Sequence, residues 1–537
     1  MGPSLLTWSL ATDWDHLART ARHAIVGVGT RDCQHESPPG GRKAATTPRI
    51  AGIMPFDGLQ DYLSALSRRG ELKTIARVVD PDLEIAEVAD RVILLGGPAL
   101  RFTQPRGARY PVVINLFGTL ARTAFALGVA ELDELGARIE ALLRTQPPGT
   151  FLEKLRALPR LAEMASWAPH TVKRAACQEV VEAQPSLYDL PVLKSWPQDG
   201  GPFLTLPLVI TAHPETGQRN VGMYRMQVFD PHTTGMHWHP HKVGAEHYRG
   251  YERLGRRMPV AVALGCDPAV IYAATAPLPE EFDEFLFAGF LRRRAVDLVP
   301  ARTVDLLVPA EAEFVLEGYV DPGERRTEGP FGDHTGYYSL ADEFPVFHLT
   351  ALTRRANPVY PATIVGRPPK EDRFLAKATE RIFLPVIRMQ LPEILDINLP
   401  PEGVFHNLAL VRIRKRYPGH AYKVMHALWG LGQMMFTKII AVFDEEVDVQ
   451  DLGEVLWRLG NHIDPERDVC FVRGPVDILD HAARLPGFGS KMGIDATRKW
   501  SEEGFTRPWP DAIEMSPEVK ARVDALWADL NLEGGDG

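Results

Sequence analysis

The chain has 537 residues, of which 45% are hydrophobic and 24% charged, and its formal net charge is −9. This length predicts about three or four domains, and the negative charge argues against a nucleic-acid-binding protein, whose phosphate-contacting surface is basic. Four scattered cysteines without a CxxC pair exclude a cysteine zinc cage and fit a reducing compartment. Since no apolar run reaches the length of about 18 residues that a transmembrane helix needs, we expect a cytoplasmic protein.

The first 53 residues read as a flexible N-terminal extension. The stretch "ESPPGGRKAATTP" (Glu36–Pro48) is typical of a linker, and Met54 is an alternative start. A short apolar patch near the N-terminus lacks a preceding basic segment, so it does not fit a signal peptide. We expect no chemistry from this extension.

Helix and strand patterns alternate over residues 54–175. Leu59, Tyr62, Leu63 and Leu66 recur at helical spacing, and Gly70 ends the predicted helix. A second helix is predicted in "DLEIAEVADRVILLGG", and "YPVVINLF" is a β-branched run that predicts a strand. These patterns predict an N-terminal α/β domain.

The composition changes twice more along the chain. Over residues 176–345, short apolar runs such as "FLTLPLVIT" and "MPVAVALG" are separated by Gly and Pro turns, which favours a sheet or barrel with few helices. Over residues 346–500, a helix at "AYKVMHALWGL" and a strand-turn-helix pattern in "TKIIAVFDEEVDVQDLGEVLWRL" predict a second α/β domain. A tail over residues 501–537 ends in one helix, "SPEVKARVDALWADL". The fold class is therefore α/β with several domains.

Two carboxylates lie five positions apart in "EGPFGDHTGYYS" (Glu328–Ser339). That spacing places the side chains of Glu328 and Asp333 on different faces of a helix or strand, so they converge only if Gly-Pro-Phe-Gly bends. The alternative is a surface turn that Asp333 caps.

The segment from Asn220 to His247 is rich in polar side chains, with five histidines around a hairpin that turns at "DPHTTG". Asn220 and Arg225 would face opposite sides of a regular strand, so a shared site requires a bulge, which Gly222 permits. If Arg225 is buried, it needs an anionic partner such as Glu328 or a substrate carboxylate. The alternative is an arginine that extends to the surface.

Other residues in this part of the chain suggest a metal-binding site. His237, His239 and His241 would lie on one face of a strand, a spacing that can bind zinc or manganese, although no HExxH motif or nearby acid supports it. Solvent-facing histidines are the alternative. Glu284 lies on or beside the apolar stripe of a predicted helix in "PLPEEFDEFLFAGFLRRR", so it needs a cation or a hydrogen-bond partner.

Together these segments resemble the UbiD-type decarboxylases, which use prenylated FMN. The resemblance extends from about Met54 to Trp500. It is carried by five segments in the same order, which are "GELKTIARVVDPDLEIAEVADRVILLGGPALRF", "NVGMYR", "EFLFAGFLR", "EGPFGDHTGYY" and "GSKMGIDATRKW".

The resemblance implies an N-terminal α/β domain, a central split β-barrel that binds the flavin, and a C-terminal α/β domain that helps to assemble homo-oligomers. Asn220 and Glu284 match the family's ligands for a divalent cation, usually manganese, that bridges to the flavin phosphate. Arg225, Glu328 and Asp333 match its catalytic trio. The positions that match flavin contacts are Met223, Tyr224, Arg225, His237, Trp238, His239, Lys242 and Val243.

Two departures suggest a branch of the family. The ferulic acid decarboxylase branch has a third metal ligand, a histidine, where this chain has Lys242, and a protonated lysine cannot bind a metal. Asp333 replaces the glutamate of the acrylic-acid enzymes. Both point to the bacterial 3-polyprenyl-4-hydroxybenzoate decarboxylases of ubiquinone synthesis. The substrate alternatives are a hydroxynaphthoate or a smaller phenolic acid, and the physiological direction stays open.

The trio predicts how a proton replaces CO₂. Arg225 would hold a carboxylate and lower the pKa of Glu328. Burial and the charge of Glu328 would raise the pKa of Asp333, so that Asp333 returns the proton. The implied partners are a flavin prenyltransferase that makes the cofactor and, for a lipid-like substrate, a peripheral membrane contact. Other function classes left open are a flavin-binding module without decarboxylase activity and a plain FMN oxidoreductase.

Overall fold

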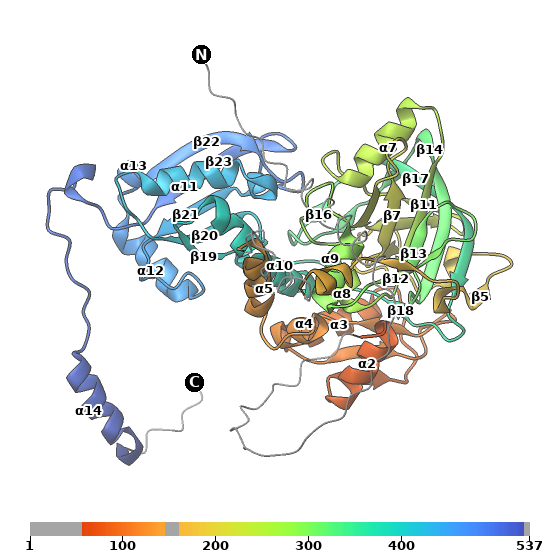
Figure 1. Ribbon diagram of the computed structural model, residues 1–537, viewed down its shortest axis with the longest axis horizontal. Coiled ribbons are helices and arrows are strands. Elements are labelled where there is room, and N and C mark those ends of the chain that lie inside the picture. The colour runs from red at the N-terminus through yellow and green to blue at the C-terminus, as the bar shows by residue number, and fades with distance from the viewer. Residues whose placement is uncertain (1–55, 145–159, 531–537) are drawn as a thin grey trace, which may run out of the picture.

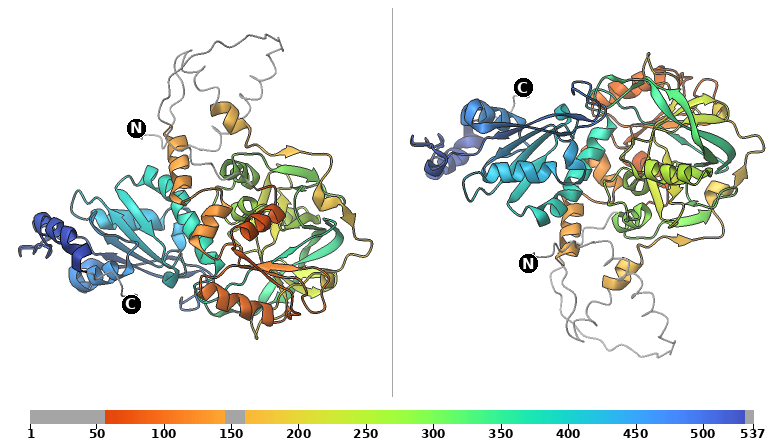
Figure 2. Two further views of the ribbon diagram at one scale, coloured as in Figure 1. Left: turned by 90° about the horizontal axis from the view of Figure 1, so that it is seen from below. Right: turned by 90° about the horizontal axis from the view of Figure 1, so that it is seen from above.

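The computed structural model describes residues 56–144 and 160–530 (Figure 1). The predicted extension, residues 1–53, therefore lies outside the described residues. The described chain forms a larger block of N-terminal and central elements and a smaller block of C-terminal elements. Figure 2 shows the two blocks side by side from two further directions, with helices α5 (Asp133–Leu143) and α10 (Glu371–Gln390) at their junction.

A four-stranded mixed sheet with its helices forms one part of the larger block. The predicted helix at residue 59 is α2, which buries Leu59, Tyr62, Leu63 and Leu66 on one face as the spacing requires. The strand order is β1-β2-β3-β18, so a strand that follows the central elements in sequence completes this sheet. The further elements are β1 (Leu72–Ile75), α3 (Glu84–Leu94), β2 (Ala99–Phe102), β3 (Val112–Ile114), α4 (Leu120–Ala126) and β18 (Tyr360–Pro361).

A nine-stranded sheet forms the centre of the larger block, in the order β6-β9-β10-β17-β14-β11-β7-β8 with β5 beside β17. The long strands β14 and β17 pair in an antiparallel ribbon at the centre of this sheet, and β14 ends at Glu328. The strands are β5 (Val180–Val181), β6 (Phe203–Leu204), β7 (Leu208–Ala212), β8 (Arg219–Met223), β9 (Met226–Asp230), β10 (Thr233–Gly235), β11 (Met258–Leu264), β14 (Phe314–Glu328) and β17 (Asp342–Arg354).

The α/β multidomain class is confirmed, and the central sheet is open, since its edge strands β6 and β8 do not pair with each other. Two small sheets and three helices accompany it. The small sheets are built from β4 (His170–Thr171), β12 (Asp297–Pro300) and β13 (Leu307–Pro309), and from β15 (Phe331–Gly332) and β16 (Tyr338–Ser339). The helices are α7 (Val243–Arg253), α8 (Pro268–Ala273) and α9 (Glu284–Arg292).

The smaller block is a five-stranded sheet in the order β19-β20-β21-β23-β22 with helices beside it. The predicted helix near residue 421 is α11, and the predicted strand-turn-helix unit is β21 and α12. The elements are β19 (Ile394–Asn398), β20 (Leu408–Ile413), α11 (His420–Trp429), β21 (Ile439–Phe443), α12 (Leu452–His462), α13 (Pro465–Asp468), β22 (Val469–Pro475) and β23 (Phe488–Asp495).

The tail ends in helix α14 (Pro517–Trp527), which stands away from the smaller block (Figure 1). Its apolar side chains Val523, Leu526 and Trp527 are exposed. Within the described ranges, none of the helices is both long and apolar enough to cross a membrane.

Candidate active site

Three charged side chains from distant parts of the chain meet inside the central sheet. Arg225 lies between β8 and β9, and its Nε donates to Glu328 Oε1 at 3.1 Å. Its Nη1 donates to Asp333, and its Nη2 donates to Ser339 Oγ at 3.0 Å. The guanidinium also lies over the ring of Phe331, 4.4 Å from the ring centroid. The structure thus brings Arg225, Glu328 and Asp333 to one point, and the Arg225 side chain, which is 10% exposed, does not extend to the surface.

The Gly-Pro-Phe-Gly segment bends because its backbone is held from two sides. β15 pairs with β16, which places Ser339 opposite Phe331. From the other side, the buried Asp199 accepts hydrogen bonds from the backbone N–H of Gly332 at 2.8 Å and of Trp196 at 2.9 Å. These contacts hold the bend that points both acids at Arg225, so the segment is not a surface turn.

Glu328 is fully buried at the end of β14. Its Oε1 lies 2.7 Å from His237 Nδ1 in addition to the contact with Arg225. Its Oε2 has no hydrogen-bond partner among the described residues. A Cβ atom at Gly235 would lie only 2.6 Å from that Oε2, so only glycine leaves room for the carboxylate.

The prediction that Asp333 has a raised pKa is wrong. Burial acts in the expected direction and raises it. The hydrogen bond and the charge of His334, together with the charge of Arg225, outweigh burial and hold the pKa of Asp333 well below its usual range. His334 Nδ1 lies 2.7 Å from Asp333 Oδ1, and the backbone N–H of His334 donates to the same oxygen at 2.8 Å. Asp333 is therefore a carboxylate at neutral pH.

The predicted bulge at Gly222 is also wrong. β8 pairs with β7 in regular register from Arg219 to Met223, and the chain leaves the strand only at Tyr224. A Cβ atom at Gly222 would lie 2.3 Å from the ring of Tyr224, so this glycine makes room for that ring. Arg225 reaches the site because the strand ends, not because it bulges.

Glu284 contacts the backbone of the residue that follows Asn220. Glu284 opens α9, and its Oε2 accepts a hydrogen bond from the backbone N–H of Val221 at 3.0 Å, beside Asn220. Burial raises the pKa of Glu284 to about 8, and Arg219, whose charge acts to lower this pKa, is paired with Asp283. An amide oxygen and an uncompensated carboxylate fit a divalent cation, which prefers oxygen ligands and would keep Glu284 ionised.

The three alternating histidines do not lie on a strand, because β10 ends at Gly235 and the chain from residue 236 to 241 is irregular. His237 Nε2 lies 3.0 Å from His239 Nε2, and the ring of His239 stacks on that of His241 with centroids 5.9 Å apart. Burial and the neighbouring charges of His237 and His241 lower the pKa of His239 to about 2. The three histidines form a row in which burial lowers the pKa of each ring. Among the described residues, the one group of three possible ligands around a point is Asp321, Glu324 and His348, elsewhere on the ribbon of β14 and β17.

The remaining predicted flavin contacts surround the start of α7. Trp238 packs edge-on against Tyr224 with centroids 6.4 Å apart, and its Nε1 is buried with no hydrogen-bond partner among the described residues. Lys242 precedes Val243, the first residue of α7, and burial lowers the pKa of Lys242. Met223 donates its backbone N–H to Ala274 O at 3.0 Å. A lysine at a helix N-terminus and an unused indole N–H fit a phosphate-bearing ligand with polar groups.

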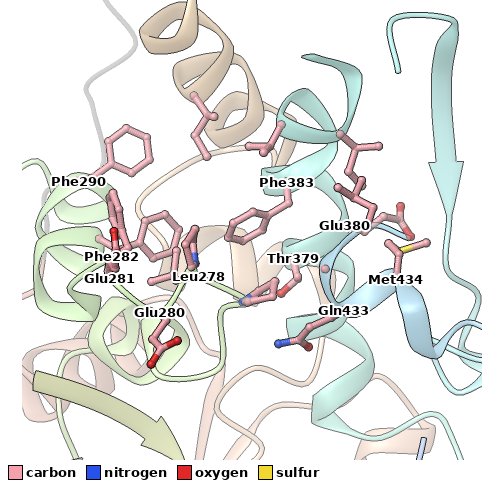
Figure 3. A pocket seen from close by; sticks show the side chains of 18 of the residues that line it. Leu278, Glu280, Glu281, Phe282, Phe290, Thr379, Glu380, Phe383, Gln433 and Met434 are labelled. Atoms are coloured by element: carbon pink, nitrogen blue, oxygen red, sulfur yellow. The ribbon is translucent and has the colours of Figure 1, made fainter. Parts of the chain in front are cut away.

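A cavity of about 1270 Å³ lies between helices α5, α9 and α10 and loops of the smaller block. His239 and Lys242 line it, and so do His334 and His406. Figure 3 shows Phe282 and Phe290 on one side of the cavity and Phe383 from α10 on the other. Its volume exceeds the range of about 300–1000 Å³ that is usual for a single small ligand, so it has room for a cofactor and a substrate.

Several residues of the site could not be found from sequence. Ser339, which holds Arg225, and Asp199, which holds the bend, are polar residues in loops with no distinctive spacing. His334 directly follows Asp333 in the chain, and this adjacency is the sequence feature that could have identified it as a site residue. His406 lies 3.1 Å from His334 through space but 72 positions away in the chain, and no local pattern marks it.

Comparison with known proteins identifies the protein family to which the chain belongs. The family models that match are the N-terminal domain (residues 63–139), the Rift-related domain (residues 170–368) and the C-terminal domain (residues 373–496) of 3-octaprenyl-4-hydroxybenzoate carboxy-lyase. The chain belongs to this family, the UbiD family, and is a carboxy-lyase. Uncharacterised proteins from Archaeoglobus fulgidus and Aquifex aeolicus are each 52% identical to it, and each match covers 89% of this chain and 99% of the relative.

Solved structures agree with this assignment. The closed form of vanillic acid decarboxylase from Sedimentibacter hydroxybenzoicus has a TM-score of 0.77 and 28% identity, covering 89% of this chain and 99% of that one. The UbiD-class enzyme HmfF from Pelotomaculum thermopropionicum, in complex with FMN, has a TM-score of 0.73 and 30% identity, covering 86% and 98%. An evolved dimeric form of HmfF in complex with prFMN has a TM-score of 0.70. The protein thus has the fold of UbiD-class aromatic acid decarboxylases.

Proposed function

We propose that this protein removes CO₂ non-oxidatively from an aromatic acid that carries a large apolar substituent, with prenylated FMN as its cofactor. A 3-polyprenyl-4-hydroxybenzoate-like quinone precursor of ubiquinone synthesis is the substrate type we favour. The observation that carries the proposal is the contact of Arg225 with both Glu328 and Asp333, beside His334, which lines a large cavity.

The cofactor assignment is supported by the donors around the cavity and by the HmfF complexes with FMN and prFMN. Lys242 and the start of α7 would hold the flavin phosphate, and Asn220 and Glu284 would hold Mn²⁺. Tyr224, Arg225 and Trp238 would contact the flavin itself. Prenylated FMN, when bound, supplies a place for the electrons that remain on the ring carbon as CO₂ departs.

The chain's own residues orient the substrate and move the proton. Three of the five N–H groups of Arg225 bond to Glu328, Asp333 and Ser339, which leaves one on each Nη for a substrate carboxylate. Asp333 would return a proton to the ring carbon after CO₂ leaves. Because Asp333 is held ionised in the resting site, it needs a group that supplies its proton.

The substrate class is supported by the walls of the cavity. Leu278, Phe282, Leu286, Phe290 and Phe383 line it, and they give an apolar surface suited to a hydrocarbon chain. A substrate without such a chain, for example a small phenolic acid, would leave this surface in contact with water. The vanillic acid decarboxylase among the similar structures favours a small phenolic acid as the second candidate.

The first experiment tests the activity itself. The protein is co-expressed with a flavin prenyltransferase, its absorbance spectrum is recorded, and aromatic acids with and without prenyl chains are screened for CO₂ release by mass spectrometry. We expect flavin absorbance and CO₂ release from at least one prenylated acid. A protein that takes up no flavin under these conditions would contradict the proposal, and NAD(P)H oxidation would indicate an FMN oxidoreductase instead.

A second experiment tests the apolar wall. Leu286→Trp places a large ring in the cavity, so we expect KM to rise for a prenylated acid and to stay unchanged for the same acid without the chain. Leu340→Trp is the matched control, because Leu340 is exposed and lies outside the cavity lining. An equal effect of Leu286→Trp on both acids would argue for the small phenolic substrate.

We also propose that the protein works in the cytoplasm as a homo-oligomer and contacts a membrane surface to collect its substrate. The exposed apolar face of α14, with Leu526 and Trp527, supports contact with a second copy. Sedimentation of the full chain and of a chain ending at residue 511 tests this, since loss of α14 should shift the protein towards the monomer.

A further inference from the structure

One wall of the cavity is a short segment of the smaller block. Six residues between Leu431 and Thr437 line the cavity, among them Met434 and Phe436. Figure 3 shows the side chains of Gln433 and Met434 in this wall. The segment forms a 3₁₀ helix (Gly432–Phe436) between α11 and β21. Since the hydrogen-bond geometry of a 3₁₀ helix is poor, contacts with the rest of the block must hold this wall in place.

Lys491 holds the segment from outside the cavity. It lies on β23, is only 2% exposed and is not among the residues that line the cavity. Its Nζ donates to the backbone carbonyls of Met435 and Thr437, the latter at 2.8 Å. Trp429 Nε1 also donates to Thr437 O, at 3.0 Å. Because Met435 and Thr437 flank Phe436, the ammonium fixes the backbone on both sides of that ring.

The ammonium of Lys491 lacks a counter-charge. Among the described residues it forms no ion pair, and burial lowers its pKa to about 8. An unpaired buried charge costs free energy, so an apolar side chain would serve the stability of the sheet at least as well. The neighbouring strand β22 leaves room for the lysine, since a Cβ atom at Gly474 would lie 3.1 Å from Lys491 Cε. What the lysine adds is the pair of carbonyl contacts beside Phe436.

Phe436 joins this wall to the larger block. Its ring centroid lies 4.9 Å from that of His241, at an interplanar angle of 50°. His241 stacks in turn on His239, with centroids 5.9 Å apart. Phe436 therefore packs against the end of the histidine row. Since the chain around His241 is irregular, side-chain contacts of this kind set the position of the ring.

The segment that Phe436 supports carries candidate site residues at both ends. At one end, His237 Nδ1 lies 2.7 Å from Glu328 Oε1. At the other end, Lys242 precedes α7, where the flavin phosphate would bind. A shift of His241 would therefore move groups that are proposed to hold the flavin.

We propose that Lys491 is a positioning residue of the active site, because it holds Phe436 against His241 and thereby fixes the residues that would contact the flavin. The inference rests on the proposed function, since the flavin belongs to that proposal. Phe436, which lines the cavity, is the group through which Lys491 acts.

The position of Phe436 is tested first, in the protein without flavin. Histidine labelled with ¹³C at Cε1 is introduced into the wild type, K491M, F436L and K423M, and NMR spectra are recorded at neutral pH. The signal missing in H241Q is that of His241. An aromatic ring shifts the signals of protons beside it, so the loss of the ring in F436L moves the His241 signal.

We expect K491M to move the His241 signal in the same direction as F436L, and K423M to leave it in place. Lys423 is the matched control, because its ammonium is 44% exposed and pairs with Glu393. A His241 signal that K491M leaves unmoved would overturn the inference. If K491M does not fold, G474A takes its place, since the added methyl would press on Lys491 Cε. G474A should give a smaller shift in the same direction, and an unmoved signal would again overturn the inference.

The consequence for the flavin is measured with FMN as the probe. Quenching of FMN fluorescence gives the Kd of the wild type, K491M, F436L, the double variant and K423M. We expect K491M and F436L each to raise the Kd by about 10-fold and K423M to leave it unchanged. The double variant should match F436L, because Lys491 acts through the ring that F436L has already removed. Effects that add in the double variant would show a merely structural role of Lys491 and would overturn the inference.

The two measurements separate this inference from the proposed function. If the wild type binds no FMN and releases no CO₂, the proposed function is wrong, and the His241 signal still decides whether Lys491 positions Phe436. If the wild type binds FMN and releases CO₂ while K491M and F436L keep its Kd, the inference is wrong and the decarboxylation stands.

Discussion

Arg225 Nε lies 3.1 Å from Glu328 Oε1, although 103 positions separate these residues in the chain. Glu328 is fully buried, and its Oε1 contacts both this guanidinium and the ring of His237. A buried carboxylate without such a partner would shift to its neutral form or destabilise the fold. The contact therefore contributes to stability as well as to the site.

Arg225→Lys tests that double role. A lysine ammonium has one nitrogen and cannot bond to Glu328, Asp333 and Ser339 in the geometry of the guanidinium. We expect the free energy of unfolding to fall by about 2 kcal/mol in urea denaturation, and CO₂ release to fall by at least about 100-fold. Arg326→Lys is the matched control, because its ion pair with Asp230 is largely exposed and contributes little. Equal losses in both variants would contradict the special role of Arg225.

Gly235→Ala tests the packing around the same carboxylate. The added methyl would lie 2.6 Å from Glu328 Oε2, and Glu328 cannot move away because Arg225 and His237 hold its other oxygen. We expect a loss of about 1–3 kcal/mol in the free energy of unfolding, together with a loss of activity.

Gly460→Ala is the control for Gly235→Ala. Gly460 lies on α12, and a Cβ atom there meets open space. Alanine favours a helix over glycine by about 1 kcal/mol, so we expect this variant to be more stable than the wild type and equally active. A stable and active Gly235→Ala protein would show that Glu328 is free to move.

Asp333→Asn tests the interaction with His334. Removal of the carboxylate removes the main cause that raises the pKa of His334, and burial then lowers that pKa below its ordinary value. We also expect CO₂ release to be lost, because an amide cannot return a proton to carbon.

The pH dependence of stability follows from the two pKa shifts. The folded-state pKa of Asp333 is depressed, so its contribution is present above the unfolded value of about 3.9 and is lost as pH falls. The folded-state pKa of His334 is raised, so its contribution is present below about 6.5 and is lost as pH rises through the folded value. Wild type should exceed Asp333→Asn in stability most between about pH 4 and 6.5. Urea denaturation at pH 5 and pH 8 measures this, with Asp305→Asn, at an exposed loop position, as the control.

Local patterns predicted the elements because their causes are local. The helical spacing of Leu59, Tyr62, Leu63 and Leu66 is the buried face of α2, and the β-branched run before Asn115 is β3. The convergence of Glu328 and Asp333 could be expected as well, since the Gly-Pro-Phe-Gly segment allows few regular conformations.

The errors concern interactions between distant residues. The pKa of Asp333 depends on where the ring of His334 points, and residue spacing does not report that orientation. The position of Arg225 depends on where β8 stops pairing with β7, and the sequence favoured a bulge at Gly222 because glycine is common in bulges. His406 reaches the site only through the folding of the smaller block against the larger one, so no local pattern could identify it.

Glu284 provides the test of the proposed cation site. Its carboxylate is desolvated at the start of α9, and it accepts a hydrogen bond from the backbone N–H of Val221 at 3.0 Å. Among the described residues it forms no ion pair. A divalent cation bound there binds the folded state and not the unfolded one, so it stabilises the protein by about 2.7 kcal/mol at 100 times its Kd. Thermal unfolding of the wild type with FMN should therefore shift to higher temperature when MnCl₂ is added.

Glu284→Gln should lose most of that Mn²⁺-dependent shift, because an uncharged amide is a much weaker ligand for a hard cation. The same variant should unfold at an equal or higher temperature than the wild type when no metal is present, since the amide oxygen still accepts from Val221 and no uncompensated charge is buried. This second measurement distinguishes a lost ligand from a damaged fold. Glu281→Gln, an exposed acid three positions earlier at the cavity, should respond to Mn²⁺ as the wild type does. If Glu284→Gln keeps the full shift, the cation is bound elsewhere and the pairing of Asn220 with Glu284 has another role.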